Sequence, residues 1–151
     1  SCTAFPTNSG SGSIEAFESL APLVVWKKEF RTDSGGAGQY MGGLGQDVEI
    51  EVTAEDTIRL SMMSDRQKYA AKGLLDGREG AKVEIMKSDG TRPHQKARSA
   101  LDPGERLTLR FGGGGGYGRP EDRDPDAVRS DLRNGYITPD FAKHNYGVDE
   151  R

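Results

Sequence analysis

Two stretches of the chain alternate between apolar and polar residues. Valine and isoleucine alternate with acidic side chains over residues 48–52, and isoleucine, leucine and methionine alternate with polar side chains over residues 58–62. A period of two residues is that of a β-strand with one buried face. Only residues 53–56 separate the two stretches, and such a short connection favours an antiparallel hairpin.

Weaker patterns predict the remaining elements of the first two thirds of the chain. Residues 24–30, 83–87 and 107–111 are rich in valine, isoleucine, leucine and phenylalanine and are predicted to be strands. Apolar residues recur at helical spacing over residues 14–21, directly after Ser13 and before Pro22. This spacing predicts a short helix that Pro22 ends.

The period changes in the C-terminal part of the chain. Asp124-Pro125 and Thr138-Pro139 each place a capping residue before a proline, and Gly135 and Gly147 follow the two apolar stretches. These are the usual start and stop signals of helices. The sequence therefore predicts an α+β fold. A mainly antiparallel β body with glycine-rich loops spans residues 1–118, and a short two-helix C-terminal tail, residues 119–151, packs on it.

Two glycine clusters, residues 33–45 and residues 112–118, interrupt this pattern. Ordered glycines stand where the backbone must pass very close to another group or adopt positive φ. The second cluster matches the dinucleotide-binding spacing of glycines, but a polar, acidic stretch follows it instead of a helix, and no Walker lysine closes either cluster. We therefore interpret residues 112–118 as a close-packed crossing between the last strand and the tail, pressed against a body outside this sequence.

Composition supports a folded piece whose core is completed by another polypeptide. Hydrophobic residues make up 33% of the 151 residues, and the net charge is only −3. So few core residues predict low stability or oligomerisation for the chain alone. The near-balanced charge argues against nucleic acid as a partner, and no apolar run is long enough to span a membrane.

The start of the chain and its single cysteine bear on its cellular location. The chain begins at Ser1 without an initiator methionine or a signal-peptide pattern, which favours an interior start. Cys2 has no partner for an intrachain disulfide and fits a reducing compartment. We therefore expect a cytoplasmic protein.

Two polar clusters are candidates for substrate binding. Thr7 and Asn8 precede Glu15, and Asp65 and Arg66 follow the second alternating strand. The alternative for the first cluster is an Asx turn with a helix start, and for the second an acid–base pair that closes a strand end. Polar residues at strand ends and in loops often line functional sites, so both clusters stay candidates.

No metal site or catalytic residue is readable in the sequence. Three aspartates alternate from Asp122, as at the start of a calcium loop, but Ala127 and Arg133 stand where that loop needs glycine and glutamate. His94 and His144 are far apart and lack ligand spacing. A nucleophilic role for Cys2 or Ser1 lacks a recognisable base.

A set of motifs follows in order along the chain. It consists of Thr7-Asn8 with Glu15-x-x-Glu18, Arg31-x-Asp33-Ser34-Gly35-Gly36-Ala37-Gly38-x-Tyr40-x-Gly42-Gly43-x-Gly45, Leu60-Ser61-x-x-Ser64-Asp65-Arg66, Gly113 to Gly118, Arg123-Asp124-Pro125-x-Ala127-Val128 and Tyr146-Gly147-Val148. Taken together, these motifs resemble the C-terminal part of the hydantoinase B family, which includes N-methylhydantoinase B, the corresponding half of 5-oxoprolinase, and subunits of acetone and acetophenone carboxylases. The resemblance covers nearly the whole chain.

The resemblance implies part of an ATP-dependent enzyme that hydrolyses a cyclic amide, with hydantoinase or 5-oxoprolinase activity. It implies two partners, the rest of a hydantoinase B-like subunit and a hydantoinase A-like subunit that uses ATP. ATP and a divalent metal would act in the complete enzyme, with neither bound by this segment, which alone would be inactive. Two alternatives stay open: a subunit of an ATP-dependent carboxylase acting on a ketone, and a non-catalytic structural assembly module.

Overall fold

The computed structural model describes residues 12–94, 96 and 98–149. Three short α-helices, one 3-10 turn and six strands follow one another along the chain. Their order is α1 (Ile14–Leu20), β1 (Leu23–Arg31), β2 (Gly45–Val52), β3 (Ile58–Ser61), β4 (Glu84–Lys87), β5 (Arg98–Leu101), β6 (Arg106–Arg110), η1 (Pro120–Asp122), α2 (Pro125–Arg133) and α3 (Pro139–Tyr146).

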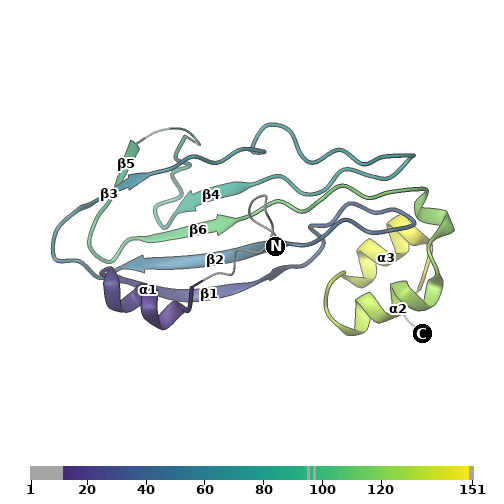
Figure 1. The fold of residues 1–151 in the computed structure, drawn as a ribbon, viewed down its shortest axis with the longest axis horizontal. Coiled ribbons are helices and arrows are strands. Elements are labelled where there is room, and N and C mark those ends of the chain that lie inside the picture. The colour runs from purple at the N-terminus through teal and green to yellow at the C-terminus, as the bar shows by residue number, and fades with distance from the viewer. Residues whose placement is uncertain (1–11, 95, 97, 150–151) are drawn as a thin grey trace.

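The strands form two sheets, and every paired strand is antiparallel. The larger sheet has the order β1-β2-β6-β4, and the smaller one pairs β3 with β5. The two C-terminal helices lie together beyond one end of the sheets, and α1 lies beside the opposite part of β1 (Figure 1). The predicted α+β fold with a mainly antiparallel β body and two C-terminal helices is confirmed.

The predicted hairpin between the two alternating strands is wrong. β2 pairs with β1 and β6, whereas β3 leaves the larger sheet and pairs with β5. Backbone groups at the end of β2 are already occupied: the amide of Val52 donates to Glu105, and its carbonyl accepts from Gly104. The short connection after Val52 therefore carries the chain from one sheet to the other.

The main core lies between the two sheets. Val52, Leu101 and Leu107 are almost completely buried, and they come from β2, β5 and β6. Met62, Val83 and Ile85 complete this cluster. The alternation in β2 and β3 thus places the apolar residues of both sheets in one shared layer.

Three glycine-rich segments extend side by side beyond the larger sheet, toward α2 and α3 (Figure 1). They are residues 33–44, 70–82 and 112–118, and we call them the glycine bundle. Main-chain hydrogen bonds join all three: the amide of Gly36 donates to Gly114, and the amide of Gly116 donates to Arg78. The bundle is therefore held by backbone contacts.

Most glycines of the bundle are required because a side chain would strike a neighbouring main-chain atom. A Cβ atom at Gly113 would lie 2.0 Å from the Ser34 oxygen, and one at Gly116 would lie 2.1 Å from the Ala37 oxygen. The close-packed crossing predicted for residues 112–118 is present. Within this chain it packs against the other two segments of the bundle, and the expected contact with a body outside this sequence stays a prediction.

The C-terminal helices begin and end as the sequence predicts. The side chains of Asp124 and Thr138 cap α2 and α3, each followed by proline, and Gly147 ends α3 with a φ of 65°. Val128, Ile137 and Ala142 form a small core of their own, against which Met41 of the glycine bundle packs. The tail therefore lies against the loop between β1 and β2.

Candidate functional site

The larger sheet turns a charged face away from the core. The strand register places two rows of side chains across this face. In the order β1, β2, β6 and β4, one row is Lys27, Glu49, Thr108 and Met86, and the next is Glu29, Asp47, Arg110 and Glu84. We define the charged sheet face by the residues that point to this side: Lys27, Glu29, Arg31, Asp47, Glu49, Glu51, Glu84, Met86, Arg106, Thr108 and Arg110.

Opposite charges pair along the charged sheet face. Arg106 contacts Glu51 at 2.8 Å and Glu49 at 3.2 Å. Its guanidinium also lies 4.8 Å from the ring centre of Trp26, whose indole nitrogen donates to Glu51 at 2.7 Å. Trp26 lies at the irregularity in the pairing of β1 with β2. That irregularity brings the indole beside Arg106.

A second part of the face is organised by Arg31, which is only 8% exposed although it is charged. Its guanidinium donates to the carboxylate of Glu84 and to the carbonyl of Lys82, both at 2.7 Å. Its partner position on β2 is Gly45, which has no side chain to block it. Arg31 of edge strand β1 thereby reaches the opposite edge strand β4.

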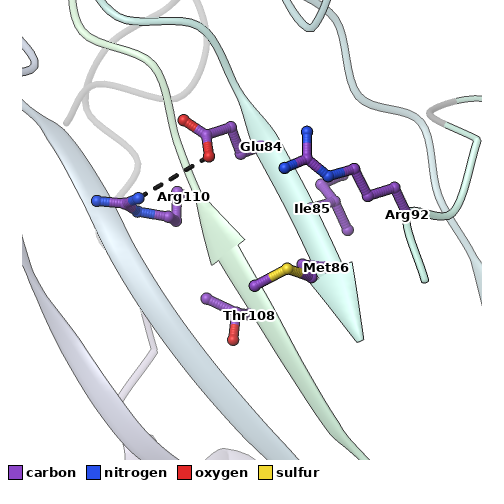
Figure 2. A pocket seen from close by; sticks show the side chains of 6 residues that line it. All are labelled: Glu84, Ile85, Met86, Arg92, Thr108 and Arg110. Carbon is purple, nitrogen blue, oxygen red and sulfur yellow. Dashed lines mark ion pairs between the residues drawn. The ribbon is translucent and has the colours of Figure 1, made fainter. Parts of the chain in front are cut away.

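Three shallow hollows lie along β4 and the strands beside it. One of about 60 Å³ is lined by six residues: Glu84, Ile85, Met86, Arg92, Thr108 and Arg110. Figure 2 shows the β4 residues facing Arg110 and Thr108 of β6, with Arg92 approaching from the segment after β4.

The other two hollows flank this one and are larger. One of about 300 Å³ continues over Lys27, Asp47 and Glu49, and one of about 270 Å³ opens at the outer edge of β4 beside Gln67 and Pro93. A space of this size accepts a small polar molecule or a side chain of another protein.

The electrostatics of this face favour binding over proton transfer. The hydrogen bond from Arg106, followed by that from Trp26, lowers the pKa of Glu51, and the contact with Glu29 raises the pKa of Lys27. The pKa of Arg106 is raised, chiefly by its hydrogen bond to Glu51. Each shift stabilises the charged form, whereas a general acid or base needs a pKa near the working pH.

The structure separates the residues that the sequence nominated for substrate binding. Glu15 is exposed on α1, which contacts β1 at one edge of the larger sheet. Asp65 and Arg66 lie near the other edge, because the carbonyl of Arg66 accepts from Val83, next to β4. Thr7 and Asn8 lie outside the described residues. Their role in substrate binding stays a prediction.

Local contacts around the predicted residues are consistent with simple structural roles. Asp65 pairs with Lys96 at 3.0 Å, and its side chain is 80% exposed. Arg66 has a φ of 64° at the turn that leads away from β3. Glu18, beside Glu15, accepts a hydrogen bond from the amide of Val25 at 2.7 Å. Glu18 therefore ties α1 to β1.

Sequence reasoning did not nominate the charged sheet face. Its acidic residues were seen only as the polar half of an alternating strand. The missed signal is that two strands carry complementary charge patterns. Acidic residues alternate in β2, and the basic residues Arg106 and Arg110 lie on the matching face of β6. Cross-strand pairs of opposite charge stabilise neighbouring strands, so this match could have paired β2 with β6.

The described residues do not fit a metal ion or a nucleotide phosphate. Within residues 12–94, 96 and 98–149, no group of three or more His, Cys, Asp or Glu side chains could hold a metal. The amides of Gly114, Gly116 and Gly118, which a phosphate cradle would use, donate to carbonyls of the glycine bundle. No helix in the described part of the chain is long and apolar enough to cross a membrane.

Comparison with known proteins places the chain in a family. The family model described as Hydantoinase B/oxoprolinase matches residues 1–120. The chain is 34% identical to the caprolactamase subunit beta of Pseudomonas jessenii, over 91% of this chain and 25% of that subunit. It is 33% identical to 5-oxoprolinase PfmaA of Pestalotiopsis fici, over 85% of this chain and 10% of that protein.

Two further comparisons agree. The acetone carboxylase alpha subunit of Xanthobacter autotrophicus is 27% identical over 91% of this chain and 22% of its own length. The crystal structure of the ATP-dependent caprolactamase from Pseudomonas jessenii superimposes with a TM-score of 0.78 and 27% identity, covering 93% of this chain and 26% of that one. The chain thus spans about a quarter or less of the relatives it matches. It belongs to the hydantoinase B/oxoprolinase family.

Proposed function

We propose that this chain is the C-terminal portion of a hydantoinase B-type subunit of an ATP-dependent cyclic-amide hydrolase. The observation that carries the proposal is the 34% identity to the caprolactamase subunit beta over 91% of this chain. In this proposal the rest of the subunit and an A-like subunit that uses ATP complete the enzyme, which works in the cytoplasm. The tail from residue 119 onward is then a helical extension packed on the β body.

The chain supplies a binding and assembly surface within that enzyme. Ion pairs occupy the acidic groups of the charged sheet face, including Asp47 with Arg110 at 3.4 Å and Glu84 with Arg31 at 2.7 Å. Carboxylates paired in this way are poor ligands for a divalent metal, which needs free oxygen donors. In the complete enzyme, ATP and the metal are therefore bound by other parts, and this segment alone is inactive.

A ketone carboxylase is the second candidate. It is favoured by the likeness to the acetone carboxylase alpha subunit, but that likeness, at 27% identity, is weaker than the one to the caprolactamase subunit. A purely structural assembly module is the third candidate, favoured by the absence of a readable catalytic group within the described residues. The first two candidates predict different products from the same assembled complex, and the third predicts an effect on assembly alone.

An assay of the assembled complex distinguishes these candidates. The chain is produced together with the rest of a hydantoinase B-type subunit and an A-like subunit, and the complex is supplied with ATP. Caprolactam, hydantoin, 5-oxoproline, and acetone with bicarbonate are then offered separately. ATP-dependent ring opening supports the proposal, and consumption of acetone with bicarbonate supports the carboxylase. A complex that needs this chain to assemble but acts on none of these substrates supports the structural module.

We retain Thr7, Asn8, Glu15, Asp65 and Arg66 as proposed contacts to the small-molecule substrate. Asp65 offers the sharpest test because its carboxylate is largely exposed and replacing it removes no buried group. Asp65→Ala should lower turnover of the assembled enzyme while its melting temperature stays the same. Lys96→Ala removes the ion-pair partner and serves as the matched control. Unchanged kinetics in Asp65→Ala would exclude Asp65 from the site.

A further inference from the structure

Four large apolar side chains are exposed where the glycine bundle meets the solvent. Tyr40, Leu74, Leu75 and Tyr117 are 64%, 66%, 67% and 47% exposed. We call these four residues the tyrosine–leucine platform. Contiguous exposed apolar residues mark interaction surfaces more often than scattered ones do.

The backbone holds the platform rigidly. Tyr40 and Tyr117 exchange two main-chain hydrogen bonds, of 3.0 Å and 2.9 Å, and their rings lie 6.2 Å apart. The amide of Leu74 donates to Gly116 at 3.0 Å, and its carbonyl accepts from Gly118 at 3.0 Å. Three segments distant in sequence therefore present their side chains in a fixed arrangement, which lowers the entropic cost of binding a partner.

The backbone conformation of Leu75 indicates that its side chain contacts a partner outside this chain. It has a φ of 49° and is followed by Asp76 with a φ of 69°, and the amide of Gly77 closes the turn on Leu74 at 3.0 Å. Glycine and asparagine are the usual residues at such positions, and leucine is strained there. The largely exposed Leu75 side chain gains little within the chain that could offset this strain. An exposed apolar side chain held in a strained conformation is typical of a contact made with a partner.

We propose that the tyrosine–leucine platform is the docking surface for the remaining body of a hydantoinase B-type subunit. This inference rests on the proposed function, and it locates the contact with the rest of the subunit at these four side chains. The relatives supply the occupant, because this chain covers 25% of the caprolactamase subunit beta and the other three quarters form polypeptide that must contact it. Tyrosine is enriched at the centres of protein interfaces, in keeping with this role.

The first test measures whether the platform becomes covered. In a chimera, this chain replaces the matching quarter of the Pseudomonas jessenii caprolactamase subunit beta. Leu75→Cys is introduced with Cys2→Ser, and alkylation by a maleimide is followed by peptide mass spectrometry. Cys at position 75 should react about tenfold more slowly in the chimera than in the dilute chain alone. Met63→Cys is the control, because Met63 is apolar, 93% exposed and close to β3, away from the bundle.

The outcomes of the labelling test are distinct. Slower reaction at position 75, with an unchanged rate at position 63, supports the platform as the docking surface. Equal rates at position 75 in the chimera and in the chain would overturn it. Protection at position 75 that appears in the chain alone as its concentration rises would assign the platform to a second copy and would overturn it as well.

The second test uses the backbone strain at Leu75. The proposal predicts that relieving this strain changes the melting temperature in opposite directions in the chain alone and in the chimera. Asparagine tolerates positive φ, so Leu75→Asn should raise the melting temperature of the chain alone by about 2–4 °C. The same substitution should lower the melting temperature of the chimera, because it removes an apolar contact to the body. Leu75→Gly gives a second variant with the same expected pattern. A rise in both contexts would overturn the proposal.

The failure of docking and the failure of the proposed function can be told apart. For this comparison the chimera is assembled with the A-like subunit. An assembled chimera that hydrolyses caprolactam with ATP while position 75 stays fully reactive would retain the function and refute the platform. An assembled chimera in which position 75 is protected but no ring is opened would retain the platform and count against the function.

Discussion

Asp33 joins the glycine bundle to the C-terminal helices through one carboxylate. One of its oxygens accepts from the amide of Thr138 at 2.7 Å, and the other accepts from the Thr138 hydroxyl at 2.8 Å. The amide of Asp33 also donates to Tyr136 at 3.1 Å. Asp33 has a φ of 60°, a conformation that aspartate adopts more readily than most residues. A single side chain thus positions the start of α3.

Replacing this carboxylate should loosen the tail. We expect Asp33→Ala to lower the free energy of unfolding by about 2 kcal/mol, because a charged acceptor of two hydrogen bonds is lost. Denaturation in urea measures the loss. Asp33→Asn keeps an acceptor and should lose less, and Asp33→Gly separates the carboxylate's effect from backbone strain. An Asp33→Ala midpoint equal to that of the unchanged chain would contradict this role.

Tyr146 and Arg123 form a second local contact between the C-terminal helices. The Tyr146 hydroxyl lies buried without a hydrogen-bond partner in the described part of the protein, and burial raises its pKa. Arg123 lies 5.7 Å from the Tyr146 ring centre and pairs with Asp131 at 2.6 Å. Arg123 therefore connects Asp131 of α2 with Tyr146 of α3.

At the scale of elements, the glycine bundle sets the strictest requirement on sequence. We expect Gly113→Ala to destabilise the chain by about 3 kcal/mol or more, because its Cβ would overlap the Ser34 carbonyl and the backbone would have to shift. Gly43→Ala is the matched control within the bundle, since nothing lies within 4 Å of a Cβ at that position. Chemical denaturation of both variants tests the difference, and an equally small effect at Gly113 would refute tight packing.

Sequence patterns predicted most elements but not all of their pairings. Caps and prolines located α1, α2 and α3, because these signals act within a few residues. Alternation identified β2 and β3 as strands, but it shows which face is buried and says nothing about the partner. β5 was missed because Arg98–Leu101 contains serine and alanine in place of β-branched residues. Its strand conformation depends on pairing with β3, which is a tertiary effect.

The candidate site was less predictable than the fold. The charged sheet face combines residues of four strands, and its composition became visible only when β2 was found between β1 and β6. Arg31 and Glu84 illustrate the difficulty, because their 2.7 Å contact joins residues more than fifty positions apart across two intervening strands. The tyrosine–leucine platform likewise depends on three segments that meet only in the bundle.

At the scale of the whole molecule, a small core stands beside a large exposed platform. Within the described residues, the buried cluster between the sheets is accompanied by a separate cluster under α2 and α3. Much of the remaining order is maintained by backbone hydrogen bonds in the glycine bundle. Because hydrophobic burial is the main favourable contribution to folding, the margin of stability should be small.

The isolated chain should therefore be either weakly stable or associated. We expect a melting temperature below the range of about 45–65 °C typical of mesophilic domains, or a sedimentation coefficient larger than that of a monomer. Calorimetry and analytical ultracentrifugation on the same sample measure both properties. A monomer with a cooperative transition within or above that range would contradict the expectation and would show that the chain needs no partner for its stability.

The glycine bundle also has a consequence for how this protein evolves. An altered side chain in an ordinary core is often rescued by a smaller neighbour, because the neighbour has atoms to lose. At Gly116 the neighbouring atom is the Ala37 carbonyl oxygen, which every amino acid carries. No second substitution removes that atom, so a mutation at Gly116 is reversed only by restoring glycine. At positions such as Gly116 and Gly113, where the neighbouring atom is a main-chain oxygen, compensatory mutation is closed off, and descendants retain glycine there or lose the packing of the bundle.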